Sequence, residues 1–272
     1  LKGSYGIFHQ MIRRLNERSL YLSIPETWTL SGENTIPVLR SAHYIMGAVY
    51  EIDDWEITLE GYHKYEHGVV EFLFPAFGIP TGSLDQFAVD GNRRVFGVDA
   101  LLKKSFDNQN VMLGYTFISS ESRYDDINQG NYFVSPGVSN HEVSLIYNLE
   151  YNRWDFSAAF VLANGVPFTP VLGTFLVTTP NGDQQQFVTI GGINSSRLEW
   201  YHRLDISAGY TMPLRKGVLQ MGVSVYNVYD NLAVKYVDYF QIPREDSDFY
   251  DLGQRNILSL GFTPSVFLKL KL

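Results

Sequence analysis

The sequence predicts an all-β protein: an antiparallel up-and-down transmembrane β-barrel, with about ten strands in this chain. Three observations predict it: segments in which apolar and polar residues alternate, connections that alternate between short and long, and an aromatic content of 15%. Side chains along a strand point to opposite faces with a period of two residues, so an alternating segment has one apolar and one polar face. Barrel strands in a bilayer show this pattern, because one face meets lipid and the other meets the lumen.

The C-terminal segment, residues 255–272, carries the clearest alternation. Apolar residues occupy every second position from Leu258 to Leu272, and polar residues or glycine fill the positions between them, with Phe267 as the exception. We expect one long strand here, well beyond the five or six residues of an ordinary globular strand. A spanning β-strand takes about 9–11 tilted residues, so an apolar stripe of this length favours a bilayer.

Nine further segments are predicted as strands. Five alternate regularly, at 111–117, 143–149, 154–160, 204–212 and 219–225. Four alternate less regularly, at 1–15, 40–52, 54–74 and 91–106.

The connections between these segments alternate strictly in length. Short turns are predicted at Asp53-Asp54, Asp107–Asn110, Asn152-Arg153 and Pro213–Gly217, and long loops at 16–39, 75–90, 124–139, 164–199 and 232–253. Up-and-down barrels of the outer membrane have short periplasmic turns and long outer loops. About ten strands then place both chain ends on the short-turn side.

Two further local features fit this layout. The 164–199 loop is predicted to hold its own hairpin, with Thr174–Thr179 and Gln186–Ile190 flanking an Asn-Gly turn. Trp55 and Trp154 each follow a short turn directly, where an interfacial aromatic girdle is expected.

Composition excludes several classes. Among 272 residues, 21 Lys and Arg stand against 29 Asp and Glu for a net charge of −8, and no basic stripe indicates nucleic-acid binding. The sequence contains no run of eighteen apolar residues, so no transmembrane helix is predicted. Cysteine is absent, which excludes disulfides and thiolate metal sites. We expect one domain over residues 1–272.

Three motifs resemble the C-terminal barrel of TonB-dependent outer-membrane receptors, especially those of Bacteroidetes-type bacteria. The first is Gly165-Val166-Pro167-Phe168-Thr169-Pro170, where the chain leaves a strand for a long loop. The second is Tyr201-His202-Arg203-Leu204-Asp205-Ile206-Ser207, where it re-enters the barrel. The third is Val225-Tyr226-Asn227-Val228-Tyr229-Asp230-Asn231, at the end of the penultimate strand. Together with the sorted loops, their order and spacing resemble this family over essentially the whole chain.

The resemblance implies active uptake of a scarce solute, such as an iron chelate, cobalamin or a glycan, across the outer membrane. The family barrel has 22 strands and an N-terminal plug that contacts the TonB system. This chain therefore resembles the last part of such a barrel, without the plug. Its expected partners are outer-membrane lipid, the TonB system through the missing plug, and a small-molecule or glycan substrate. Its closing strand is expected to be an unpaired sheet edge.

Residues of two kinds are candidates for ligand binding. Arg203, Asp205, Glu142 and Asp99 are predicted to face the lumen, where charged side chains also serve as ordinary barrel structure. Aromatic side chains in the long loops offer stacking surfaces: Trp28, Tyr132, Phe133, Tyr236, Tyr239 and Tyr250. The six predicted ligand-binding residues are Trp28, Tyr132, Arg203, Asp205, Tyr236 and Tyr239.

No cofactor, metal site or catalytic residue is predicted. His63 and His67 are four residues apart, but in a strand this spacing covers about 13 Å, too far for one ion. The acidic segments Asp125-Asp126 and 245–248 carry oxygen ligands of the kind that Ca²⁺ prefers, although solvated acidic loops have the same composition.

Two other interpretations remain open from the sequence. One is a complete ten-stranded barrel, either a passive pore or an outer-membrane protease, for which Asp125, Asp126 and His141 are the candidate rim residues. The other is a soluble β-sandwich binding module, which would cover both faces of the last strand with protein.

Overall fold

The computed structural model describes residues 1–15, 27–32, 36–72 and 87–271. The predicted loops at 16–39 and 75–90 lie partly outside these residues. The described chain is all-β apart from 3₁₀ structure at Phe87 and at Asn128–Gly130. It contains no helix with the length and hydropathy that a bilayer crossing requires.

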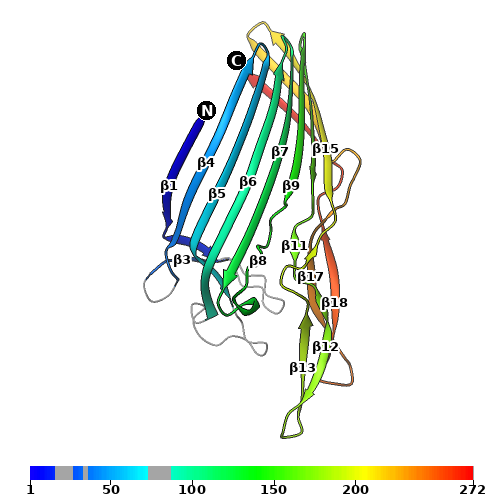
Figure 1. Ribbon diagram of the computed structural model, residues 1–272. Helices are drawn as coiled ribbons and strands as arrows, with labels where there is room; N and C mark the ends of the chain where they lie inside the picture. Colours follow the sequence, from blue (N-terminus) through cyan, green and yellow to red (C-terminus); the bar gives the residue numbers. More distant parts are fainter. Residues whose placement is uncertain (16–26, 33–35, 73–86, 272) are drawn as a thin grey trace.

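Ten strands pair in sequence order into one antiparallel sheet (Figure 1). They are β1 (Lys2–Gln10), β4 (Leu39–Ile52), β5 (Trp55–Phe72), β6 (Ala88–Ser105), β7 (Gln109–Tyr124), β9 (His141–Tyr151), β10 (Trp154–Ala163), β15 (Tyr201–Leu214), β16 (Gly217–Tyr226) and β19 (Thr263–Lys271). A short strand, β8 (Phe133–Val134), pairs with β7 beside this path. The prediction of about ten up-and-down antiparallel strands is confirmed.

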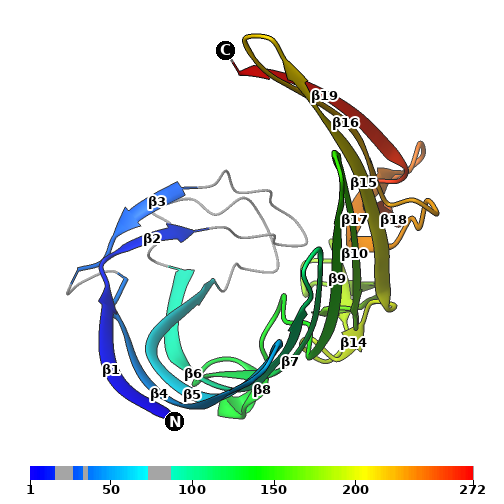
Figure 2. The same cartoon turned by 90° about the horizontal axis from the view of Figure 1, so that it is seen from above.

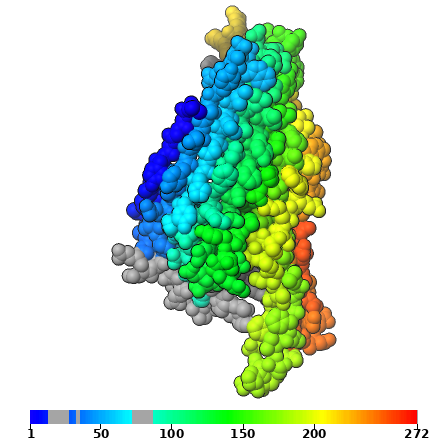
Figure 3. Space-filling model, in the orientation of Figure 1, coloured from blue at the N-terminus to red at the C-terminus, as the bar shows by residue number. Residues whose placement is uncertain are grey.

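Four smaller two-stranded sheets accompany the main sheet. They are β2 (Ile12–Leu15) with β3 (Thr27–Leu30), β11 (Pro167–Phe168) with β14 (Ser196–Arg197), β12 (Val171–Thr178) with β13 (Gln184–Ile190), and β17 (Val234–Pro243) with β18 (Tyr250–Leu258). The β12–β13 pair is the hairpin predicted within the 164–199 loop. It projects beyond the neighbouring strands in Figures 1 and 3.

The connections of the main sheet are sorted by length onto its two ends. Strand pairs β4–β5, β6–β7, β9–β10 and β15–β16 are joined by two or three residues, at the end that we call the turn end. The longer connections lie at the opposite end, the loop end, and both termini lie toward the turn end (Figure 1). Asp53 and Asn152 adopt positive φ angles of 50° and 58° in two of the turns, a conformation that Asp and Asn tolerate better than most residues.

The main sheet is open. Seen from above, it curves into an arc, with β2 and β3 on the inside (Figure 2). Its strand order begins at β1 and ends at β19, and the described residues contain no pairing between these two strands. The expectation that the last strand is a sheet edge is therefore confirmed.

The prediction of one continuous strand over 255–272 is wrong. The segment divides between β18, which pairs with β17 in a separate sheet, and β19, which pairs with β16 in the main sheet. The cause is the loop after β16. The Asn227 Nδ2 atom donates to the Leu260 carbonyl at 3.0 Å, and the Phe262 amide donates to Asp230 Oδ1 at 2.7 Å. These bonds hold the backbone between Leu258 and Thr263 in a conformation that does not pair with another strand.

The predicted strand at 1–15 is also divided. β1 ends at Gln10 and β2 begins at Ile12, where the chain leaves the main sheet to pair with β3. The Met11 carbonyl between them accepts a hydrogen bond from the Ser31 amide at 2.7 Å. The bend is thus fixed from the β3 side.

The register assigns every main-sheet residue to one of two faces, because directly opposed residues point to the same side. One face, the apolar face, carries rows such as Ile57–Leu102–Leu113–Leu145–Phe160–Leu204. The other, the polar face, carries rows such as Glu60–Asp99–Thr116–Glu142. The strand pairing therefore aligns the alternating residues of neighbouring strands, so that apolar residues share one face of the sheet and polar residues share the other.

Burial on these faces is the reverse of that in a soluble sheet. Along β5, Ile57 and Leu59 are exposed, whereas Thr58 and Glu60 are half-buried. Leu59 and Val223 are each 52% exposed. Side chains on the inside of a curved sheet converge and those on the outside splay apart, so the polar face is the concave one. The chain exposes 17722 Å², against roughly 12,000 Å² expected for a compact monomer of this mass.

A small conventional core lies at the loop end. Val69, Tyr124 and Ile127 are buried together, with partly buried apolar side chains packed around them. These come from β5, β7 and the loop after β7. The loop end is therefore packed as a water-soluble protein is, unlike the wall of the sheet.

Candidate functional site

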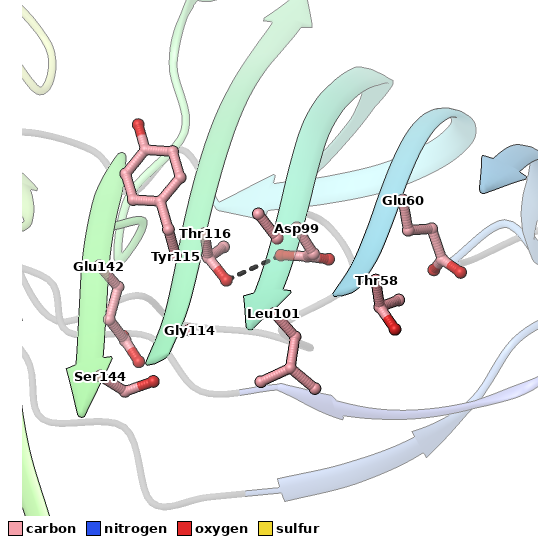
Figure 4. Close-up of a pocket in the computed structure, with 10 residues that line it drawn as sticks. Thr58, Glu60, Asp99, Leu101, Gly114, Tyr115, Thr116, Glu142 and Ser144 are labelled. Carbon is pink, nitrogen blue, oxygen red and sulfur yellow. Dashed lines mark hydrogen bonds between the residues drawn. The ribbon is translucent and has the colours of Figure 1, made fainter. Parts of the chain in front are cut away.

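A hollow on the polar face is the first candidate site. It has a volume of about 300 Å³ and is lined from β5, β6, β7 and β9 (Figure 4). Its carboxylates are those of Glu60, Asp99 and Glu142. The main-sheet register places these three acids in one row, with Thr116 between Asp99 and Glu142. The predictions that Asp99 and Glu142 share an inward-facing side of the sheet are consistent with this row.

Two of the three acids have polar partners within the sheet. The Thr116 hydroxyl donates to Asp99 Oδ1 at 2.7 Å. Glu60 forms an ion pair with Lys2 at 2.5 Å, and this pair spans Gly47, whose missing side chain leaves room for the lysine. The hollow thus presents carboxylates beside hydroxyls, a surface that accepts hydrogen bonds from hydroxyl-rich or cationic solutes.

Arg203 and Asp205 lie on the same face at the loop end of β15. Arg203 Nε donates to Asp205 Oδ2 at 2.9 Å, and its terminal nitrogen donates to the hydroxyls of Tyr201 and Tyr226, each at 2.6 Å. The guanidinium also lies 4.1 Å from the centre of the Tyr226 ring. The polar groups of Arg203 are therefore engaged inside the protein, and its contact with a ligand stays a prediction.

Asn227 connects this cluster to the last loop. Its amide N–H donates to Asp205 Oδ1 at 2.9 Å, and its side chain bonds the backbone of Asn231 twice and of Leu260 once. The side chain is 1% exposed, and its φ of 55° is left-handed. Sequence reasoning noted the surrounding motif only as a resemblance. The signal that could have identified this role is a single Asn between Tyr226 and Val228 at a strand end, where a buried amide side chain can bond backbone groups.

Two tyrosine–histidine pairs join neighbouring parts of the sheet. The Tyr229 hydroxyl lies 2.9 Å from His202 Nδ1, and the Tyr115 hydroxyl lies 2.9 Å from His141 Nδ1. Partial burial, together with the Asp205 carboxylate, raises the pKa of Tyr229.

Tyr236 and Tyr239 lie on β17, within the β17–β18 hairpin. The Tyr239 hydroxyl accepts a hydrogen bond from the Val171 amide at 3.4 Å. A second link joins the two loop hairpins: the Gln186 side chain donates to the Tyr250 carbonyl at 2.6 Å and accepts from its amide at 2.9 Å. Sequence reasoning missed Gln186, because one of three consecutive glutamines carries no distinguishing signal.

The remaining two candidates lie on other elements. Trp28 is on β3 and is 66% exposed. Tyr132 precedes β8, and the Arg94 guanidinium lies 4.1 Å from its ring centre. Of the six predicted ligand-binding residues, the structure joins Arg203 to Asp205 and places Tyr236 near Tyr239 on one strand. None of the six lines the hollow on the polar face.

The residues considered for metal or protease chemistry are engaged separately. Asp125 lies 3.8 Å from Arg123, and His141 contacts Tyr115. His63 and His67 lie on one strand, β5. Within the described ranges, no group of three or more histidine, aspartate and glutamate side chains has a geometry suited to a metal ion.

Comparison with protein-family models gave no match, and comparison with curated proteins also gave none.

Proposed function

We propose that this chain is the C-terminal part of the β-barrel of a TonB-dependent outer-membrane receptor, which takes up a scarce solute. The observation that carries the proposal is the reversed burial of the main sheet, with apolar side chains exposed on the convex face and polar side chains half-buried on the concave face. In water, exposed apolar area of this extent is unfavourable by about 25 cal/mol per Å². In a bilayer the same face is matched to hydrocarbon.

The height of the apolar face supports a bilayer. On β6 this face is bounded by Arg94 and Lys104, and the four residues between them on that face are apolar. Ten residues of strand rise about 33 Å, which a tilt of about 40° projects to about 25 Å along the membrane normal. Outer-membrane barrels carry an apolar band about 25 Å tall.

The open sheet favours part of a large barrel over a complete small one. β1 and β19 stand at opposite ends of the strand order, and Figure 2 shows them far apart on the arc. An unpaired edge within hydrocarbon would leave backbone groups without partners, at a cost of several kcal/mol each. In the proposal, both edges pair with further strands of a 22-stranded barrel.

The polar face and the loop end support a solute path rather than a solid wall. The hollow of Glu60, Asp99 and Glu142 lies on the side that faces the lumen in the proposal. The two linked hairpins at the loop end extend toward the side from which a solute would arrive. A glycan, an iron chelate and cobalamin all remain candidate substrates, since each offers hydrogen-bonding groups to such a surface.

The test uses the full-length protein in its native host. We expect it in the outer-membrane fraction, and we expect deletion of its gene to abolish uptake of one labelled solute from a panel of iron chelates, cobalamin and oligosaccharides. Deletion of TonB should abolish the same uptake. Recovery of the protein in the soluble fraction without detergent would support the sandwich interpretation. Uptake that persists without TonB would support a passive pore.

A further inference from the structure

One cross-strand row on the apolar face, at its loop end, is basic. The register places His9, Arg40, His67, Asn92 and Arg123 directly opposite one another on β1, β4, β5, β6 and β7. We call these five residues the basic row. It contains no acidic residue, although the chain as a whole has a net charge of −8.

The basic row points away from the concave face. It lies on the same side as Ile57 and Leu59, with no register shift between Trp55 and His67. All of its members except Asn92 are exposed. Five strands spaced about 4.8 Å apart make the row about 19 Å long.

Three tyrosines lie near the basic row on the same face of the sheet. Tyr5, Tyr44 and Tyr65 lie on β1, β4 and β5 within four residues of the row. The Tyr5 and Tyr44 ring centres are 4.9 Å apart, and the Tyr65 ring meets His67 edge-on at 4.6 Å. Tyrosine is enriched where hydrocarbon gives way to headgroups, which fixes the level of the basic row just beyond that border.

Three acids lie near the row on this side: Asp90, which is exposed on β6 two residues from Asn92, then Glu121 and Asp125. Glu121 forms an ion pair with Arg94 at 2.6 Å, one position closer to the apolar residues, and Asp125 lies 3.8 Å from Arg123. Asp125 is 92% exposed on its side chain, so solvent screens it strongly. Arg40, opposed by His9 on one side and His67 on the other, therefore stands between two basic neighbours. Neither neighbour carries a carboxylate, so the row itself offers the Arg40 guanidinium no ion-pair partner.

We propose that the basic row binds the phosphate groups of the surrounding lipid headgroups. This inference rests on the membrane placement proposed above. Arginine binds phosphate in a bidentate manner, and imidazole and the Asn92 amide add N–H donors along the same line. The row is long enough to contact several headgroups, and it continues directly from the face that meets hydrocarbon.

The test compares two triple variants of the full-length protein in neutral detergent. The row variant is Arg40→Gln, His67→Gln and Arg123→Gln. The control variant is Arg153→Gln, Arg215→Gln and Lys216→Gln, which removes three basic residues from the turn end. Affinity for phosphatidic acid is measured by titration into the micelles, with phosphatidylcholine as the lipid without net charge.

We expect the row variant to bind phosphatidic acid about thirtyfold more weakly than the unmodified protein, since each arginine near an anionic surface contributes about fivefold. The control variant should bind as the unmodified protein does, and phosphatidylcholine should not distinguish the three. Equal weakening in both variants would overturn the inference, as would inorganic phosphate that competes at the same concentration as the lipid. A protein that enters no micelle would instead overturn the membrane placement itself.

Discussion

The wall of the main sheet and the loop end follow opposite rules of burial. In the wall, Leu59 is more exposed than its neighbour Glu60, whereas at the loop end Val69 and Tyr124 are buried. Both regions include the same strands, β5 and β7. The difference shows that β5 and β7 change their burial pattern along their length, and that the change falls near their loop end.

The largest effect is expected from arginine substitutions at two consecutive positions of β5, one on each face of the sheet. Leu59→Arg should destabilise the full-length protein in lipid vesicles by about 2–4 kcal/mol, because a cation on the lipid face must leave water. Thr58→Arg, one residue away on the polar face between Glu56 and Glu60, should change stability by less than about 1 kcal/mol.

The measurement is the free energy of unfolding in denaturant, with vesicles present. In a water-soluble protein the order would be reversed, because Leu59 is exposed and Thr58 is half-buried. The two variants therefore distinguish lipid from water on the convex face without reference to transport.

A smaller effect is expected where the wall meets the loop end, at Asn227. Replacing its side chain in Asn227→Ala leaves the Leu260 carbonyl and two backbone groups of Asn231 without this partner. We expect a loss of about 2 kcal/mol in unfolding free energy. Hydrogen exchange should accelerate at the amides of Asn231 and Phe262. Asn181→Ala, at the exposed tip of the β12–β13 hairpin, is the matched control and should leave both measurements unchanged.

The smallest effect concerns the β17–β18 hairpin, which lies wholly in the loop end. A hydrogen bond from Arg244, at 3.1 Å from its Nε atom, lowers the pKa of Asp251. A carboxyl whose folded pKa is lowered contributes stability above its unfolded pKa and loses it as the pH falls through the folded one. Any contribution of this pair to the stability of the folded protein should therefore be lost only at acidic pH.

Arg244→Gln should raise the pKa of Asp251 toward the ordinary value of an aspartate, as read from the carboxyl carbon in an NMR titration. Arg255→Gln, which removes the partner of Asp238 on the same hairpin, should leave Asp251 unchanged. A pKa of Asp251 that stays low in Arg244→Gln would show that another group holds it.

Strand positions and connection lengths could be predicted because they depend on neighbouring residues. Alternation identified β7, β9, β10, β15 and β16, and the short turn predicted at Asn152-Arg153 coincides with a positive φ angle at Asn152. The 255–272 segment shows the limit of this reasoning. Its alternation has one exception, Phe267, yet Asn227 and Asp230 bind its backbone from more than thirty residues away.

The candidate sites were predictable in type but not in arrangement. Arg203 and Asp205 are two residues apart on one strand, so period two alone placed them on one face. Glu60, Asp99 and Glu142 come from three strands, and only the register brings them into one row. The basic row is formed by one residue from each of five strands and by the four pairings between them, so no local sequence pattern predicts it.

By itself, the sequence determined which residues share a strand face and where the chain turns back, since both follow from the geometry of single strands and tight turns. The tertiary structure decided the rest. Pairing in register converted separate alternations into two continuous faces, and the curvature of the sheet placed the polar face inside. Cross-strand distance is fixed by the backbone ladder rather than by any one segment, so the rows that carry the hollow and the basic charge exist only in the folded sheet.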